Sequence, residues 1–161
     1  MSMKPKIKAF FKANRQYAVS GASNDPSKFG FKISKWYLDH ELPVVPVNPK
    51  AAEILGQEVI NSLPSVIESL GKKDIGQHKL KSMNSVSISF LTPPSITTKT
   101  LNDISKVDGF KDLIGGLWFQ PGSYDETVLQ TAEDLGLFDK VIFQDECILV
   151  RGEEGLYSSN L

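Results

Sequence analysis

Short apolar runs alternate along this chain with segments in which large apolar side chains recur at helical spacing. Apolar runs of that length are typical of buried strands, and a helix between successive strands is typical of a parallel sheet. We therefore predict an α/β fold, a three-layer sandwich with a mostly parallel central sheet. A chain of 161 residues fits one such domain.

The expected strands and helices follow from these two periodicities. An N-terminal helix should turn Ile7, Phe10 and Phe11 inward. Further helices are expected at 29–40, 51–55, just after Pro64, and at 95–107 and 125–135. Strands are expected at 17–20, 42–47, 85–91 and 113–119, with two short strands, 140–143 and 147–150, closing the chain.

Residues 71–85 interrupt the alternation because they are polar, basic and poor in apolar side chains. Such a composition predicts a solvated surface loop or a partly disordered insertion. The rest of residues 15–150 would then form the core of the domain, within a single domain that spans 1–161.

Charge and cysteine content restrict the classes of function. The net charge of -1 and the pI of about 6.1 argue against a dedicated nucleic-acid binder. The single cysteine, Cys147, excludes an intramolecular disulfide and a multi-cysteine metal site. No apolar stretch is long enough for a membrane span, and the basic N-terminus is better read as a helix than as a transit peptide. We expect a cytoplasmic protein without a membrane or nucleic-acid partner.

The residues that follow the strands are the candidates for a ligand site, since open parallel sheets bind ligands beyond the carboxyl ends of their strands. Four such loops are rich in glycine, proline and small polar residues, and none has a carboxylate within three residues of its strand. That composition suits a phosphorylated ligand. The loops are Gly21-Ala22-Ser23-Asn24, Asn48-Pro49-Lys50, Thr92-Pro93-Pro94 and Gln120-Pro121-Gly122.

The first of these loops, within "SGASNDP", is the best candidate for an anion site. Gly21 lets the backbone turn, Ser23 and Asn24 can donate to phosphate oxygens, and Pro26 suits the start of a helix. An ordinary strand-to-helix turn with a Ser or Asn cap is the alternative.

A dinucleotide site would show a different pattern. The motif G-x-G-x-x-G is absent, and Lys50 follows the second strand where a nicotinamide site usually has Asp or Glu. A lysine there favours a phosphate on the ribose, as in NADP or coenzyme A.

Several motifs together resemble those of the CoA-binding domain family, small Rossmann-type proteins similar to the nucleotide-binding domain of the succinyl-CoA synthetase alpha subunit. The matching segments are V-S-G-A-S after the first strand, P-V-N-P after the second, "FLTPP", "LWFQPGSYDE" and "QDECI". They cover about residues 15 to 150.

The resemblance implies a Rossmann-like fold that accepts coenzyme A. Gly21, Ala22, Ser23 and Asn24 would line the phosphates, and Lys50 and Lys28 would face a phosphate. Thr92, Pro93 and Pro94 would border the pantetheine arm. Asn48, Pro49, Gln120 and Gly122 belong to the same strand-end loops and complete the expected binding residues.

No catalytic residue is expected. His40 and His78 are interpreted as surface histidines, and Cys147 as a small core residue at the start of a strand, unless it lies near a pantetheine thiol. The leading prediction is a protein that binds coenzyme A or an acyl-CoA without catalysis of its own. A partner enzyme of acyl-CoA metabolism is compatible with this prediction. The alternatives are an NADP-binding protein or weak oxidoreductase, and an interaction module that has lost its ligand.

Overall fold

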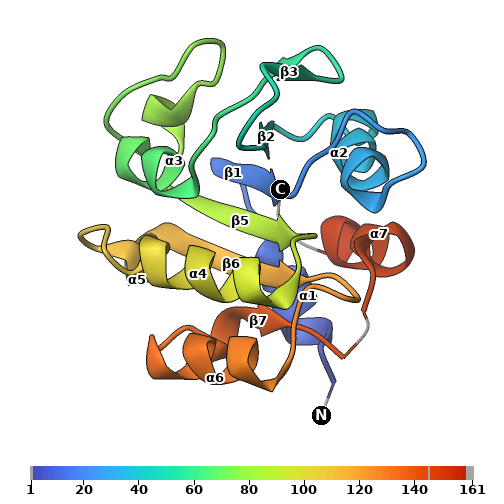
Figure 1. Cartoon of the computed structure of the whole chain (residues 1–161), viewed down its shortest axis with the longest axis vertical. Coiled ribbons are helices and arrows are strands. Elements are labelled where there is room, and N and C mark those ends of the chain that lie inside the picture. The colour runs from blue at the N-terminus through green and yellow to red at the C-terminus, as the bar shows by residue number, and fades with distance from the viewer. Residues whose placement is uncertain (1, 145, 159–161) are drawn as a thin grey trace.

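A computed structural model describes residues 2–144 and 146–158 and contains a five-stranded sheet (Figure 1). Its strands lie in the order β2-β1-β5-β6-β7, and every neighbouring pair is parallel. The chain runs outward from β1 to β2 and then returns to pair β5 on the other side of β1, so strand order reverses between β1 and β5. The strands are β1 (Arg15–Ser20), β2 (Val44–Val47), β5 (Ser85–Phe90), β6 (Ile114–Phe119) and β7 (Val141–Ile142).

Helices cover both faces of this sheet and confirm the predicted three-layer, Rossmann-like architecture (Figure 1). One face packs against α1 (Lys4–Phe10), α2 (Phe29–Asp39) and α7 (Ile148–Ser158). The other packs against α3 (Leu63–Ser69), α4 (Pro94–Ile104) and α6 (Glu126–Asp134), with the short α5 (Phe110–Leu113) before β6. None of the helices in the described ranges is both long and apolar enough to cross a membrane.

The central strand β5 alternates apolar residues with serines, yet both of its faces are buried. Val86, Ile88 and Phe90 join the core under α3, α4 and α6. On the opposite face, Ser87 Oγ donates to the carbonyl of Phe10 at 2.7 Å, and Ser89 Oγ lies 2.8 Å from the Tyr37 hydroxyl. The serines therefore anchor α1 and α2 instead of facing solvent.

The predicted strand at 147–150 is wrong, because helix α7 begins at Ile148, directly after Cys147. Gly152 and Gly155 let this helix approach its neighbours closely. A Cβ atom on Gly155 would lie 2.7 Å from the carbonyl oxygen of Ile7, and one on Gly152 would lie 2.5 Å from the Trp36 ring. The four-residue apolar run "CILV" is thus part of a helical pattern in which glycines occupy the buried positions.

The predicted helix at 51–55 is also wrong. The chain forms a hairpin of β3 (Glu53–Ile54) and β4 (Gln57–Glu58). Leu55 and Gly56, the two residues between the strands, both have positive φ angles, 52° and 75°. Two consecutive left-handed residues are the signature of a tight hairpin turn and cannot continue a helix.

The polar segment 71–85 is partly buried, so the prediction of a solvated loop fails for its central residues. His78 is 6% exposed and its Nε2 lies 2.7 Å from the carbonyl oxygen of Glu58. Leu80 is fully buried in the core beneath α3. The interpretation of His78 as a surface residue is therefore wrong, whereas Lys72 and Lys73 are exposed as expected.

Candidate functional site

The loop after β1 is shaped by two glycines. Gly21 has a φ of 95° and packs so closely on the loop after β5 that a Cβ atom would lie 3.2 Å from Leu91 and Thr92. A Cβ atom on Gly30, in the first turn of α2, would overlap the carbonyl oxygen of Gly21. The absence of a side chain at Gly30 lets the start of α2 rest directly on the end of β1, and its absence at Gly21 lets the loop after β5 pack against the same turn.

Not every backbone donor in this loop is free. The N–H groups of Gly21 and Ala22 both donate to the carbonyl of Val47 at 3.3 Å. For Ser23 and Asn24, the described part of the chain provides no acceptor for the backbone N–H. The backbone N–H groups of this loop that can bind an anion are therefore those of Ser23 and Asn24, and not those of Gly21 and Ala22.

Asp25 organises the next turn before α2. Its Oδ1 accepts from both the backbone N–H and the hydroxyl of Ser27, at 3.0 and 2.7 Å. These hydrogen bonds hold the pKa of Asp25 below its ordinary value. The helix then begins at Phe29, three residues after Pro26, so Pro26 lies in the turn and not at the first helical position.

A relay of two asparagines connects three loops. Asn61 Nδ2 donates to the carbonyl of Asn48 at 2.8 Å, and Asn48 Nδ2 donates to the carbonyl of Ala22 at 2.9 Å. The Asn48 Oδ1 in turn accepts from the N–H groups of Lys50 and Ala51. The loops after β1 and β2 and the segment before α3 are thereby held as one unit.

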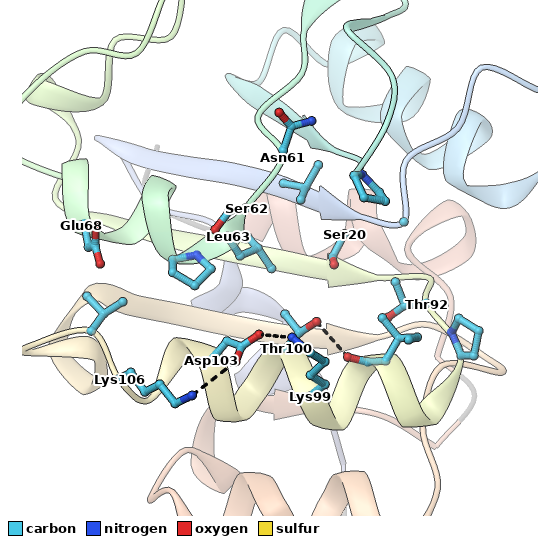
Figure 2. A pocket seen from close by; sticks show the side chains of 17 residues that line it. Ser20, Asn61, Ser62, Leu63, Glu68, Thr92, Lys99, Thr100, Asp103 and Lys106 are labelled. Atoms are coloured by element: carbon cyan, nitrogen blue, oxygen red, sulfur yellow. Dashed lines mark hydrogen bonds and ion pairs between the residues drawn. The ribbon is translucent and has the colours of Figure 1, made fainter.

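A cleft of about 830 Å³ opens beside this unit, between α3 and α4 (Figure 2). It begins where β1, β2 and β5 end, which is the point of strand-order reversal. Pro49, Leu63, Pro93 and Ile96 contribute apolar surface, and Ile96 is 47% exposed although it is a large aliphatic side chain. The size and the mixed lining are those of a small-molecule site.

The far end of the cleft is charged but balanced. Lys99 of α4 and Lys106, just after that helix, lie 2.8 and 3.8 Å from the carboxylate of Asp103. The hydrogen bond from Lys99 is the main cause that lowers the pKa of Asp103. Glu68 of α3 lines the opposite wall (Figure 2) and forms no ion pair with any residue that the structure describes.

The cleft brings together only part of the predicted binding set. Ala22 is buried, and it and Asn48 hold the loops. Asn24, Lys28 and Lys50 are exposed and Ser23 is half-buried, and all four lie outside the cleft. Pro94 is the first residue of α4, and Gly122 lies in an exposed turn. The predicted residues that line the cleft are Gly21, Pro49, Thr92 and Pro93.

Gln120 has a structural environment. It is 1% exposed, its Oε1 accepts from the N–H of Ile148 at 3.1 Å, and its Nε2 is 3.5 Å from Ser89 Oγ. It therefore fixes the start of α7. Cys147, immediately before that helix, is half-buried, so its assignment as a core residue leading a strand is wrong.

The histidines lie elsewhere and are engaged with the backbone. His40 stacks on Trp36 with a centroid separation of 4.1 Å, and its Nδ1 lies 2.7 Å from the Trp36 carbonyl oxygen. His78 is held by Glu58, as described above.

The α3 and α4 residues of the cleft were missed by the sequence analysis. Asn61 follows the β3–β4 hairpin, the first part of which was predicted as a helix. With a helix at that point, nothing in the sequence indicated that Asn61 lies beside the end of β2. The helical stripe of Ile96, Lys99, Asp103 and Lys106 looked like an ordinary exposed face. Its one signal is Ile96, an apolar side chain on an otherwise polar stripe.

A parallel sheet with a strand-order reversal, a glycine-shaped loop at that point and an adjoining cleft define the class of Rossmann-like α/β proteins. Comparison with protein-family models identifies the family within that class. The model described as CoA binding domain matches residues 15–153. The chain belongs to this CoA-binding domain family.

Solved structures agree with the fold. A conserved hypothetical protein from Pyrococcus furiosus is 29% identical, with a TM-score of 0.64 over 85% of this chain and 98% of the other. A hypothetical protein from Pyrococcus horikoshii is 22% identical, with a TM-score of 0.69 over 98% and 93%. A Thermus thermophilus protein is 21% identical, with a TM-score of 0.69 over 97% and 100%. The comparison with curated proteins gave no match.

Proposed function

We propose that this protein binds coenzyme A or an acyl-CoA at the carboxyl edge of its sheet, and that it acts by binding rather than by catalysis. The observation that carries the proposal is the cleft at the strand-order reversal, bounded by Gly21, Pro49 and Thr92, in a chain whose family is named for CoA binding.

The phosphates are assigned to the loop before α2. The N–H groups of Ser23 and Asn24 are available there, as are those of Phe29 and Gly30 in the first turn of the helix. A helix N-terminus attracts anions through its free N–H groups and its dipole. Lys28 and Lys50 are exposed on either side of this loop and add positive charge.

The uncharged part of the ligand is assigned to the cleft. Pro49, Pro93 and Ile96 offer an apolar wall, and burial of Ile96 by a ligand would remove an exposed aliphatic side chain from water. The histidines are bonded to backbone carbonyls away from the cleft, which favours binding over acid–base catalysis as the function.

Isothermal titration tests the proposal with coenzyme A, dephospho-CoA, NADP and NAD as ligands. We expect micromolar binding of coenzyme A. Lys50→Glu should weaken it by roughly tenfold or more, because a phosphate contact is replaced by repulsion. Lys72→Glu, at an exposed lysine of the 71–85 segment, is the control of equal charge change and should leave the affinity unaltered.

The ligands separate the alternatives. If dephospho-CoA binds as tightly as coenzyme A to the wild-type protein, Lys50 does not meet the ribose phosphate. Tight binding of NADP without coenzyme A would replace the proposal by an NADP-binding function. Silence of all four ligands at millimolar concentration would leave an interaction module that has lost its ligand.

A further inference from the structure

Arg15 is a buried cation at the amino end of β1, the end opposite the ligand loop. It is 8% exposed, and burial lowers the pKa of its guanidinium. Within residues 2–144 and 146–158, no carboxylate forms an ion pair with it. Buried charges are ordinarily paired, so an unpaired arginine needs an explanation.

Neutral groups accept hydrogen bonds from two of the three guanidinium nitrogens, Nε and Nη1. Its Nε donates to Ser85 Oγ at 2.9 Å, and its Nη1 donates to the carbonyls of Ala9 and Phe10 at 2.8 and 3.1 Å. These carbonyls end helix α1, where a cation is favourable. They supply partial charges only, so the full positive charge is not neutralised.

The remaining guanidinium nitrogen, Nη2, is not fully buried. Arginine has five N–H donors, two of them on Nη2, and the described residues provide no acceptor for Nη2. No fully buried side-chain nitrogen or oxygen in the described ranges lacks a partner. Nη2 is therefore the accessible part of a side chain that lines a cavity of about 760 Å³ at the amino edge of the sheet.

That cavity has a positive balance, in contrast to the cleft between α3 and α4. Lys8, Lys12 and Lys140 line it together with Arg15, and the carboxylates present are Asp112 and Asp139. Four cations therefore face two anions. Lys140 is partly committed, since its Nζ donates to the carbonyls of Lys111 and Ile114. Lys8 and Lys12 are the exposed cations that line the cavity together with Arg15.

We propose that this cavity is a second ligand site, distinct from the nucleotide-ligand site, that binds the phosphate group of a small phosphorylated metabolite through Arg15 Nη2, Lys8 and Lys12. The planar guanidinium can present both Nη2 donors to phosphate oxygens. A cavity of this volume exceeds what a free phosphate ion fills, which is why the rest of a small metabolite belongs to the ligand.

Inorganic phosphate is the first probe, titrated into the full chain in a phosphate-free buffer of low ionic strength while amide and arginine Nε–H resonances are followed by NMR. The Nε–H of Arg15 and the amides of Asn84 and Ser85 should shift in a saturable manner. Lys12→Gln should weaken phosphate binding by several-fold to roughly tenfold, as expected for one charge-assisted contact. Asp139→Asn should strengthen it, and Lys72→Gln is the control that should not change it.

Citrate, titrated in parallel, distinguishes a phosphate site from a general anion site. Stronger binding of citrate than of phosphate would overturn the assignment to phosphate. Shifts confined to Ser23, Asn24 and their neighbours would overturn the second site, since they would mark the ligand loop alone. Lys12→Gln should leave the affinity for coenzyme A unaltered, so failure here is separable from failure of the proposed CoA function.

Discussion

The carbonyl oxygen of Gly21 lies against the α-carbon of Gly30, so that the end of β1 and the first turn of α2 touch without an intervening side chain. Gly30→Ala should therefore destabilise the protein by about 1–3 kcal/mol, the usual cost of forcing an atom into a packed contact. In an unhindered helix the same change stabilises by about 0.5–1 kcal/mol, so even the sign is diagnostic. Urea unfolding followed by tryptophan fluorescence measures it.

Gly109→Ala is a suitable comparison for that variant. Gly109 has a φ of 75° and open space around its α-carbon, so alanine there meets backbone strain but no neighbour. Gly109→Ala should lose stability but keep its affinity for coenzyme A, whereas Gly30→Ala should also lose affinity because the ligand loop is displaced. An unchanged affinity in Gly30→Ala would contradict the role of this contact in shaping the site.

Asn48 should contribute more to the free energy of unfolding than is usual for a half-buried side chain. Asn48→Ala removes the donor to Ala22 and the acceptor for Lys50 and Ala51, and we expect a loss of about 1–3 kcal/mol in the free energy of unfolding. Asn24→Ala, which removes one exposed hydrogen bond to Glu53, should cost less than half as much. Equal losses would show that the asparagine relay does not act as a unit.

The pKa of Asp25 should depend on Ser27. Because the Ser27 hydroxyl is the largest cause of the lowered pKa, Ser27→Ala should raise it toward the ordinary aspartate value. A lowered pKa in the folded state contributes stability above the unfolded-state pKa, and that contribution disappears as pH falls through the folded-state pKa. In Ser27→Ala this contribution should be smaller, and its loss should be complete at a higher pH. An NMR titration of the Asp25 carboxyl carbon checks this, with Asp103 as the internal reference.

Helix α7 depends on its buried glycines. Gly155→Ala should destabilise the protein by about 1–3 kcal/mol, because the added methyl group meets the backbone of Ile7. Thermal unfolding followed by circular dichroism measures this change. A stabilised Gly155→Ala protein would mean that α7 does not pack on α1 as described.

Gly115→Ala, in β6, should also destabilise the protein, since its methyl group would press on the Arg15 guanidinium that caps α1. The same thermal unfolding experiment measures this change.

The parts of the fold that could be predicted from the sequence are those with one clear pattern. Strands β1 and β2 contain unbroken apolar runs, β5 alternates apolar residues with serines, and α2 repeats large apolar side chains at helical spacing. The Asp25-to-Gly30 region was only partly predicted. The close contact of Gly30 with Gly21 exists only once the two elements are packed.

The errors share one physical cause, the dominance of tertiary packing over short local patterns. The run "CILV" is too short to distinguish a strand from a helix, and the close contacts of Gly152 with Trp36 and of Gly155 with Ile7 exist only in the packed structure. Residues 51–55 have helix-forming side chains, yet Leu55 adopts a left-handed conformation to close the β3–β4 turn.

The candidate site was predicted less well than the fold. Loops at strand ends could be located because parallel strands bring their carboxyl ends to one edge. The wall of the cleft could not be located in this way. Ile96 and Lys99 come from α4 and Asn61 from the segment before α3, and only the packing of these helices decides what their residues face.

The contact of Gly21 with Leu91 and Thr92 has a consequence for how the protein acquires its shape during synthesis. β1 pairs with β5, and Arg15 and Ser85 at the start of these strands are 70 residues apart. The ligand loop is thus encoded early but has nothing to rest on until β5 has been made. Since long-range parallel pairing forms slowly, the loop should be completed late in folding, after more than half of the chain has left the ribosome.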